Sequence, residues 1–129
     1  MFIRFVSGDI NAQSHAQAGL FCAAYKLRDE GELPEYELDR LSDLLGWFDA
    51  YLRSPFDFRL RSGWRSRRAI CWFKSSAHEY LARAREMINL LEANDVYINT
   101  IKSEKIGYKL YEDDAQVLAQ PFSDMRLNF

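Results

Sequence analysis

Apolar residues recur at intervals of three and four along the first half of the chain, and this period predicts two amphipathic helices. The first covers residues 12–27 and ends near Gly31, a residue type that commonly follows the last helical turn. The second covers residues 38–52, with Pro34 permitting its start and Pro55 ending it. Because only a short link separates the two segments, we expect them to pack against each other as a helical hairpin.

A third helix is predicted by the same spacing of apolar positions, which runs through residues 77–91. Ser76 and Glu79 have the spacing of a capping box, in which the hydroxyl accepts from one backbone amide and the carboxylate reaches back to another. The helix is expected to begin at Ser75 or Ser76 and to stop at Asn94.

Elsewhere the pattern is typical of short strands, since β-branched and aromatic residues stand between turn-forming residues. We predict strands at residues 2–6, 96–101, 107–111 and 115–120, and an irregular segment at 54–73. The last three strands are expected to form a meander that the N-terminal strand joins. These elements predict an α+β fold in which three helices pack on one face of a small, mainly antiparallel sheet of about four strands.

The chain of 129 residues fits one domain, residues 1–129, because single domains typically have ~100–150 residues. No apolar run reaches the ~20 residues that a membrane-spanning helix needs, and the N-terminus lacks the pattern of a secretory signal. Cys22 and Cys71 stand among apolar residues, which favours buried free thiols over a disulfide. We therefore expect a cytoplasmic protein without membrane contact.

Positive charge is concentrated in residues 53–74, which hold six arginines and one lysine against a single acid, Asp57. This segment carries +6, whereas the whole chain carries −2, so the rest of the chain carries −8. Such segregation of charge predicts an anionic small molecule or an acidic protein surface as partner, or a contact with the protein's own acidic half. The acidic total argues against a general nucleic-acid binder, whose domain is usually basic throughout.

The candidate binding residues are the cations of this segment and one aromatic residue among them. They are Arg59, Arg61, Trp64, Arg65, Arg67, Arg68 and Lys74. Arginine offers a planar fork of donors that matches phosphate or carboxylate and stacks on aromatic rings. An equally simple interpretation is structural: the arginines form ion pairs with residues 112–114 and the acidic helices, and the aromatic residues belong to the core. Both interpretations remain open, whereas residues 69–73 are expected to be core.

Other chemistry is weakly represented, and we assign no catalytic residue, metal or cofactor. The sequence has no C-x-x-C or H-x-x-x-H spacing for zinc, and no glycine-rich phosphate loop. The acidic tip at residues 112–114 predicts a solvated turn rather than a cation site. A catalytic pair of Cys71 and His78 would need the two residues to meet in space, and a structural thiol is the simpler expectation.

Three motifs carry a resemblance to a known family. They are Ala-Ile-Cys-Trp-Phe-Lys-Ser-Ser-Ala at 69–77, Gly-Tyr-Lys-Leu-Tyr-Glu-Asp at 107–113 and Gln-Val-Leu-Ala-Gln-Pro-Phe at 116–122. Together they resemble a widespread family of small bacterial proteins of unknown function, over nearly the full chain. Ile106 stands where the family pattern has proline. The resemblance implies a one-domain cytosolic protein and no particular activity, so no site residue is transferred from it.

Two functional hypotheses follow. The first is a non-catalytic binding module that holds an anionic ligand or acidic partner through residues 59–74. The alternative is a small enzyme acting on a phosphorylated or carboxylated substrate; its anion clamps would be Arg65, Arg67, Arg68 and Lys74, and its acid or base Glu112, Asp113 or His78. The enzyme requires a cleft that contains a carboxylate or histidine with a perturbed pKa. The absence of a recognisable catalytic constellation favours the binding module.

The oligomeric state stays open at the level of sequence. Trp47, Tyr51 and Phe129 are aromatic residues that one small core does not obviously absorb, which leaves both a monomer and a homodimer possible.

Overall fold

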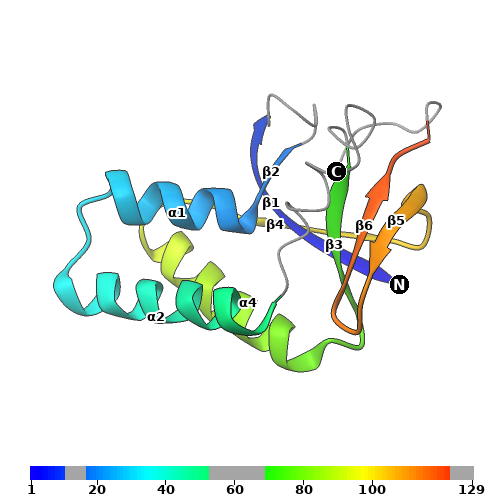
Figure 1. Ribbon diagram of the computed structural model, residues 1–129. Helices are drawn as coiled ribbons and strands as arrows, with labels where there is room; N and C mark the ends of the chain where they lie inside the picture. The colour runs from blue at the N-terminus through cyan, green and yellow to red at the C-terminus, as the bar shows by residue number, and fades with distance from the viewer. Residues whose placement is uncertain (11–16, 53–68, 123–129) are drawn as a thin grey trace.

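The computed structural model describes residues 1–10, 17–52 and 69–122, and these form three helices and six strands (Figure 1). In chain order the elements are β1 (Phe2–Ile10), β2 (Gln17–Gly19), α1 (Leu20–Glu30), α2 (Glu35–Tyr51), β3 (Ile70–Lys74), α4 (His78–Ala93), β4 (Asn99–Ser103), β5 (Tyr108–Glu112) and β6 (Gln116–Gln120). The predicted α+β class is confirmed. None of the helices in the described part of the chain is long and apolar enough to span a bilayer.

The strands form one antiparallel sheet in the order β2-β1-β3-β6-β5, with β4 paired to β1. Strand β4 pairs with β1 from Phe2 to Val6 and so occupies one edge of β1 over this length. The other edge is shared by two strands. There β3 pairs with Phe2 and Ile3, and β2 pairs with Val6 and Ile10. On this edge the partner of β1 therefore changes from β3 to β2 between Ile3 and Val6.

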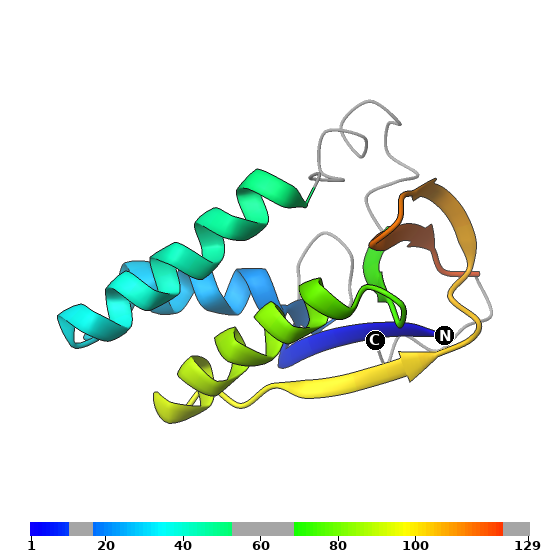
Figure 2. The same ribbon diagram turned by 90° about the horizontal axis from the view of Figure 1, so that it is seen from below.

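The sheet also curls. Strands β4 and β5 lie far apart in the strand order, yet only residues 104–107 join them along the chain. Since an extended residue spans at most ~3.6 Å, this link forces β5 back toward β4, and Figure 2 shows the sheet bent in this way. The bend encloses a small apolar cluster on the face away from the helices, made of Ile70, Trp72, Ile106, Val117 and Ala119.

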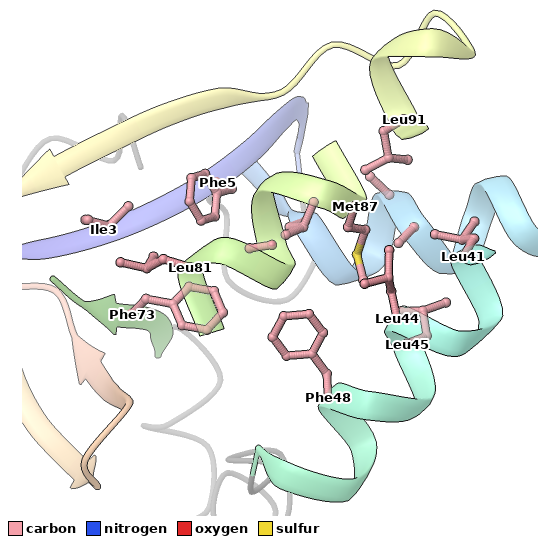
Figure 3. Packing of buried hydrophobic residues seen from close by; sticks show 14 residues of the cluster. Ile3, Phe5, Leu41, Leu44, Leu45, Phe48, Phe73, Leu81, Met87 and Leu91 are labelled. Carbon is pink, nitrogen blue, oxygen red and sulfur yellow. The ribbon is translucent and has the colours of Figure 1, made fainter. Parts of the chain in front are cut away.

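The larger core lies between the other face of the sheet and the three helices (Figure 3). Ile3 and Phe5 of β1 and Phe73 of β3 point toward the helices, which contribute leucines and Met87. The alternation of strand side chains explains the two cores, since Phe2 packs on the small cluster and Ile3 on the large one.

The helical hairpin of α1 and α2 is confirmed, and the observed bounds correct the predicted first helix. Residues 17–19 are strand β2, so α1 begins only at Leu20; residues 12–16 lie outside the described part. Pairing with β1 places this segment in the sheet although its apolar period is helical. At the other end, α1 stops at Glu30, and the Gly31 amide donates to the Leu27 carbonyl oxygen at 2.9 Å, as expected of a residue that follows a helix.

The predicted capping box is wrong. Helix α4 begins at His78 with Ala77 as its N-cap, and no side chain caps it. Ser76 instead belongs to a tight turn, in which the Ala77 amide donates to the Lys74 carbonyl oxygen and the His78 amide to the Ser76 carbonyl oxygen. The predicted end of this helix is confirmed, because Asn94 is the C-cap.

The predicted meander is also wrong. Strand β4 pairs with β1, so of the three strands predicted for the meander only β5 and β6 are paired with each other. In addition, β3 occupies residues 70–74, whose first four residues were predicted to belong to an irregular segment. The expectation that residues 69–73 are core is confirmed, since all of them except the partly exposed Cys71 are buried.

Candidate functional site

Most of the candidate residues in the basic segment lie outside the described part of the chain: Arg59, Arg61, Trp64, Arg65, Arg67 and Arg68. Lys74 is the exception. Its Nζ atom lies 2.7 Å from Glu112 Oε2, and Lys109 Nζ lies 3.6 Å from the other oxygen of the same carboxylate. The hydrogen bond from Lys74 is the main cause that lowers the pKa of Glu112. At Lys74 the structure thus shows the ion pair of the structural interpretation.

The acidic tip of the β5–β6 hairpin is built from hydrogen bonds. Asp113 accepts from the amides of Ala115 and Gln116 at 2.9 Å, from the Tyr111 hydroxyl at 2.8 Å and from the Gln116 side chain at 3.2 Å. Burial raises the pKa of Asp113, but these hydrogen bonds outweigh it and hold the pKa below its ordinary value. No group of three potential metal-binding side chains occurs among the residues that the structure places.

A pocket of about 80 Å³ lies where β1 changes its partner, and we call it the β1 pocket. Its lining comes from β1, from the start of α1, from the end of α2 and from β3 and β6. The lining residues are Arg4, Phe5, Gly19, Leu20, Phe21, Leu52, Cys71, Trp72, Phe73 and Gln116. The walls are therefore mainly apolar and aromatic, with a guanidinium, a thiol and an amide as the polar side chains.

The guanidinium of Arg4 lies between the two strands that share this edge of β1. Its Nη1 atom donates a long hydrogen bond of 3.4 Å to the Cys71 carbonyl oxygen on β3. On the side of β2, a Cβ atom added at Gly19 would stand 3.9 Å from both terminal nitrogens of Arg4. This is ordinary van der Waals distance, so the guanidinium lies beside the start of α1.

Helix α1 directs its N-terminus at the same pocket, because its N-cap Gly19 and its first two residues, Leu20 and Phe21, are part of the lining. No side chain caps this end, and the first turn contains no acidic residue. The first amides of a helix lack partners within the helix, and the helix dipole adds a partial positive charge there. The β1 pocket consequently combines this helix end with the permanent cation of Arg4.

The amide of Gln116 has a defined orientation. Its NH2 group donates to Asp113, and its oxygen accepts from the Cys71 thiol at 3.1 Å. Gln116 is only 1% exposed, and Asp113 has a carboxylate that can only accept when ionised. Asp113 therefore holds the amide with its oxygen toward Cys71 and the pocket.

Sequence reasoning did not identify Arg4 or Gln116. Each is a polar residue among apolar neighbours in a strand that contains other polar residues as well, and this is a common pattern without functional meaning. Only the topology brings them to the two sides of Cys71, whose carbonyl contacts Arg4 and whose thiol contacts Gln116.

The other singled-out residues do not gather here. Neither cysteine forms a disulfide, as predicted, but Cys22 is exposed and Cys71 is only partly buried, so the prediction of buried thiols is wrong. Cys22 lies on the exposed side of α1, so the apolar residues next to it in the sequence did not indicate burial. His78 is exposed on α4 and is not part of the pocket lining.

Of the three aromatic residues that left the oligomeric state open, Trp47 packs between α2 and α4. Trp47 packs on Tyr80 with ring centroids 5.2 Å apart, and the Arg83 guanidinium lies 4.8 Å from the Trp47 ring centroid. Tyr51 keeps 65% of its surface exposed, and Phe129 lies outside the described residues.

No family model, curated protein or solved structure matches the chain. The resemblance to a family of small bacterial proteins therefore stays a prediction, and the function has to be argued from the site.

Proposed function

We propose that the protein is a non-catalytic binding module for a small anionic ligand, which it holds in the β1 pocket. The observation that carries the proposal is the meeting of Arg4 with the uncapped N-terminus of α1 in one mainly apolar cavity. Both features favour negative charge, and helix N-termini are common anion sites when a cavity gives access to them.

The basic segment supports the same conclusion from the sequence. Residues 53–68 follow Leu52, a lining residue, and precede β3, whose Cys71 also lines the pocket. The arginines at 59–68 are thus joined at both ends to elements of the pocket. We propose that they raise the affinity for anions there. Lys74 is not part of this site, since it pairs with Glu112 and is absent from the lining.

Binding is favoured over catalysis by the chemistry of the lining. A small enzyme of the alternative kind needs an acid or base in the cavity, and within the described residues the lining has neither a carboxylate nor a histidine. The two carboxylates whose pKa is lowered, Glu112 and Asp113, are engaged in the β5–β6 hairpin. The Cys71 thiol is engaged as a donor to the amide oxygen of Gln116.

The proposal is tested by an NMR titration of backbone amides with propanoate at neutral pH and constant ionic strength. We expect saturable shifts at Gly19, Leu20 and Cys71. Arg4→Met should weaken binding by about tenfold or more, because a hydrogen bond to a charged group contributes ~1.5–3 kcal/mol. Arg83→Met is the matched control, since Arg83 stacks on Trp47 outside the pocket. Equal affinities in the two variants, or no shift at these amides, would overturn the proposal.

The contribution of the basic segment is tested with the double variant Arg65→Ala/Arg67→Ala. We expect weaker propanoate binding and an unchanged midpoint of thermal unfolding. A midpoint lowered by several degrees would instead assign these arginines to structural ion pairs.

A further inference from the structure

We infer that two copies of the chain form a symmetric dimer through the exposed side of the contact between α2 and α4. The residues of this surface, which we call the α2–α4 seam, are Asp43, Trp47, Tyr51, Tyr80 and Arg83. None of them lines the β1 pocket, so the dimer and the proposed function stand or fall independently.

The two helices of the seam run in opposite directions (Figure 1). Arg40, near the start of α2, forms an ion pair with Glu86 in the middle of α4. At the other end of the contact, the Tyr80 hydroxyl near the start of α4 donates to the carbonyl oxygen of Tyr51, the last residue of α2. The seam occupies the part of the contact where α2 ends and α4 begins.

The centre of the seam is aromatic. The Trp47 ring packs on Tyr51 and on Tyr80, with centroids 5.1 and 5.2 Å apart. Tyr51 keeps 65% of its surface exposed, and Trp47 and Tyr80 are only partly buried although both pack against the helical core. The fold therefore fixes three neighbouring rings without covering them, which is typical of an interaction surface.

Arg83 completes this cluster on the side of α4, since its guanidinium lies 4.8 Å from the Trp47 ring centroid. Tryptophan, tyrosine and arginine are the residue types that contribute most of the binding energy in protein interfaces. Here the contacts within one chain already hold the rings and the guanidinium in place, so a partner that binds them causes little further loss of side-chain freedom.

The charges beside the rings match a second copy of the same surface. Asp43 precedes Trp47 by about one helical turn, so it lies beside Trp47 along α2, as Arg83 does on the side of α4. In the part of the chain that the structure describes, neither Asp43 nor Arg83 takes part in an ion pair. A two-fold axis that lies in the surface midway between them brings Arg83 of each copy onto Asp43 of the other. The same axis brings the two aromatic centres together.

A second copy is favoured over a partner of another kind by this balance of charge. The seam contains one cation and one carboxylate, and the neighbouring pair of Arg40 and Glu86 is neutral as a whole. An acidic partner such as a nucleic acid would meet Asp43, and a basic one would meet Arg83. A second copy pairs both groups at once, and the net charge of −2 on each chain causes little repulsion between copies.

The size of the seam predicts a weak dimer. From Asp43 to Tyr51 it extends ~12 Å along α2, and across two helices it measures ~20 Å. Such a surface buries a few hundred Å² on each copy, which is less than the ~800 Å² per partner of a stable interface. We expect a dissociation constant of roughly 10–500 μM.

Sedimentation equilibrium of the wild-type chain from about 5 μM to about 1 mM tests whether the dimer exists. The average mass should rise from 15.1 kDa toward that of two chains. A mass of one chain over the whole range would overturn the inference. A mass that rises beyond two chains would also overturn it, because a two-fold contact is closed.

Tyr51→Ala tests whether the seam is the surface involved. It should weaken the dimer about fivefold or more, whereas the midpoint of thermal unfolding at low concentration should stay the same, because most of this side chain is exposed. Tyr97→Ala is the matched control: Tyr97 is 68% exposed but follows α4, outside the seam. Equal dissociation constants in the two variants would contradict the assignment.

Reversal of charge tests the pairing between copies. Asp43→Arg places a guanidinium opposite Arg83 of the second copy, and Arg83→Glu places a carboxylate opposite its Asp43. Each variant alone should therefore dimerise at least about tenfold more weakly than wild type. A mixture of the two variants should form a mixed dimer, since both of its contacts then join opposite charges.

Recovery in the mixture is decisive, because each chain still carries its own substitution and only a contact between copies can restore dimerisation. Single variants that dimerise as wild type does would overturn the pairing of Asp43 with Arg83. A mixture that stays monomeric at concentrations where wild type dimerises would overturn it as well. Both positions lie outside the buried core, and circular dichroism of each variant confirms its fold before the comparison.

Discussion

Gly107 lies so close to Gln120 that a Cβ atom added to the glycine would stand 2.1 Å from the Gln120 carbonyl oxygen. Gly107 also has a φ of +110°, a conformation that residues with side chains rarely adopt. It stands directly before β5, where the chain turns out of the link from β4 and begins the hairpin with β6. The curl of the sheet therefore depends on a position that only glycine fits.

Gly107→Ala should lower the free energy of unfolding by at least about 2 kcal/mol, because the added methyl group meets backbone and the left-handed conformation costs ~1–3 kcal/mol by itself. Urea unfolding measures this. Gly46→Ala is the control: a Cβ there meets nothing within 4 Å, and the site is an exposed turn of α2. Alanine should stabilise that helix by ~0.5–1 kcal/mol. Equal effects of the two substitutions would contradict the strain assigned to Gly107.

The sequence predicted the helices α2 and α4 well, because each helix buries one side and therefore shows a long apolar stripe with helical spacing. It failed at β3 because this strand lies between two cores. Ile70 and Trp72 face the small cluster and Phe73 the large one, so the strand reads as a continuous apolar run without alternation.

The pairing of the strands is a second feature that could not be predicted from the sequence. The residues of β4 predict a strand, but nothing local determines that it pairs with β1, about 90 to 100 positions away in the sequence, rather than with β5. The β1 pocket depends on this topology, because Arg4 meets Cys71 only through the arrangement of β1 and β3. Charge segregation did identify the basic segment, most of which lies outside the described residues, but it could not point to Arg4 or Gln116.

Asp113 should make the protein sensitive to acid. Its pKa is lower in the folded protein than in the unfolded chain, so the unfolded state takes up the proton first and lowering the pH favours unfolding. The stabilisation is complete above the unfolded-state pKa of about 3.9 and is lost as the pH falls through the lower, folded-state value. The difference in unfolding midpoint between wild type and Asp113→Asn should therefore be constant between pH 7 and about pH 5, and should shrink as the pH falls below about 3.9. A difference that does not shrink in this acid range would show that Asp113 does not stabilise through its charge.

The ion pair between Arg40 of α2 and Glu86 of α4 should contribute little to stability. Both side chains are about half exposed, at 47% and 48%, so water screens their attraction. A double-mutant cycle with Arg40→Met and Glu86→Gln should give a coupling energy below about 1 kcal/mol that decreases further at high salt. A larger coupling that is insensitive to salt would mean that this pair is a specific link between the two helices.

The small cluster inside the curled sheet should matter as much as the helical core, and Ile106 is its most direct probe. This residue lies in the four-residue link between β4 and β5, where a side chain is normally exposed, yet it is only 3% exposed and packs with Trp72 and Val117. It thus anchors the link to the inside of the bend.

Ile106→Ala should lower the free energy of unfolding by ~2–5 kcal/mol, the usual range when a buried isoleucine is truncated. Chemical denaturation measures this, with Tyr36→Ala as the control, because Tyr36 is 74% exposed and its removal should change stability by no more than about 0.5 kcal/mol. The size of the Ile106 effect distinguishes two views of the sheet. If the bend is held by its own core, the cost reaches this range; if the helical core alone holds the sheet, Ile106→Ala will resemble the control.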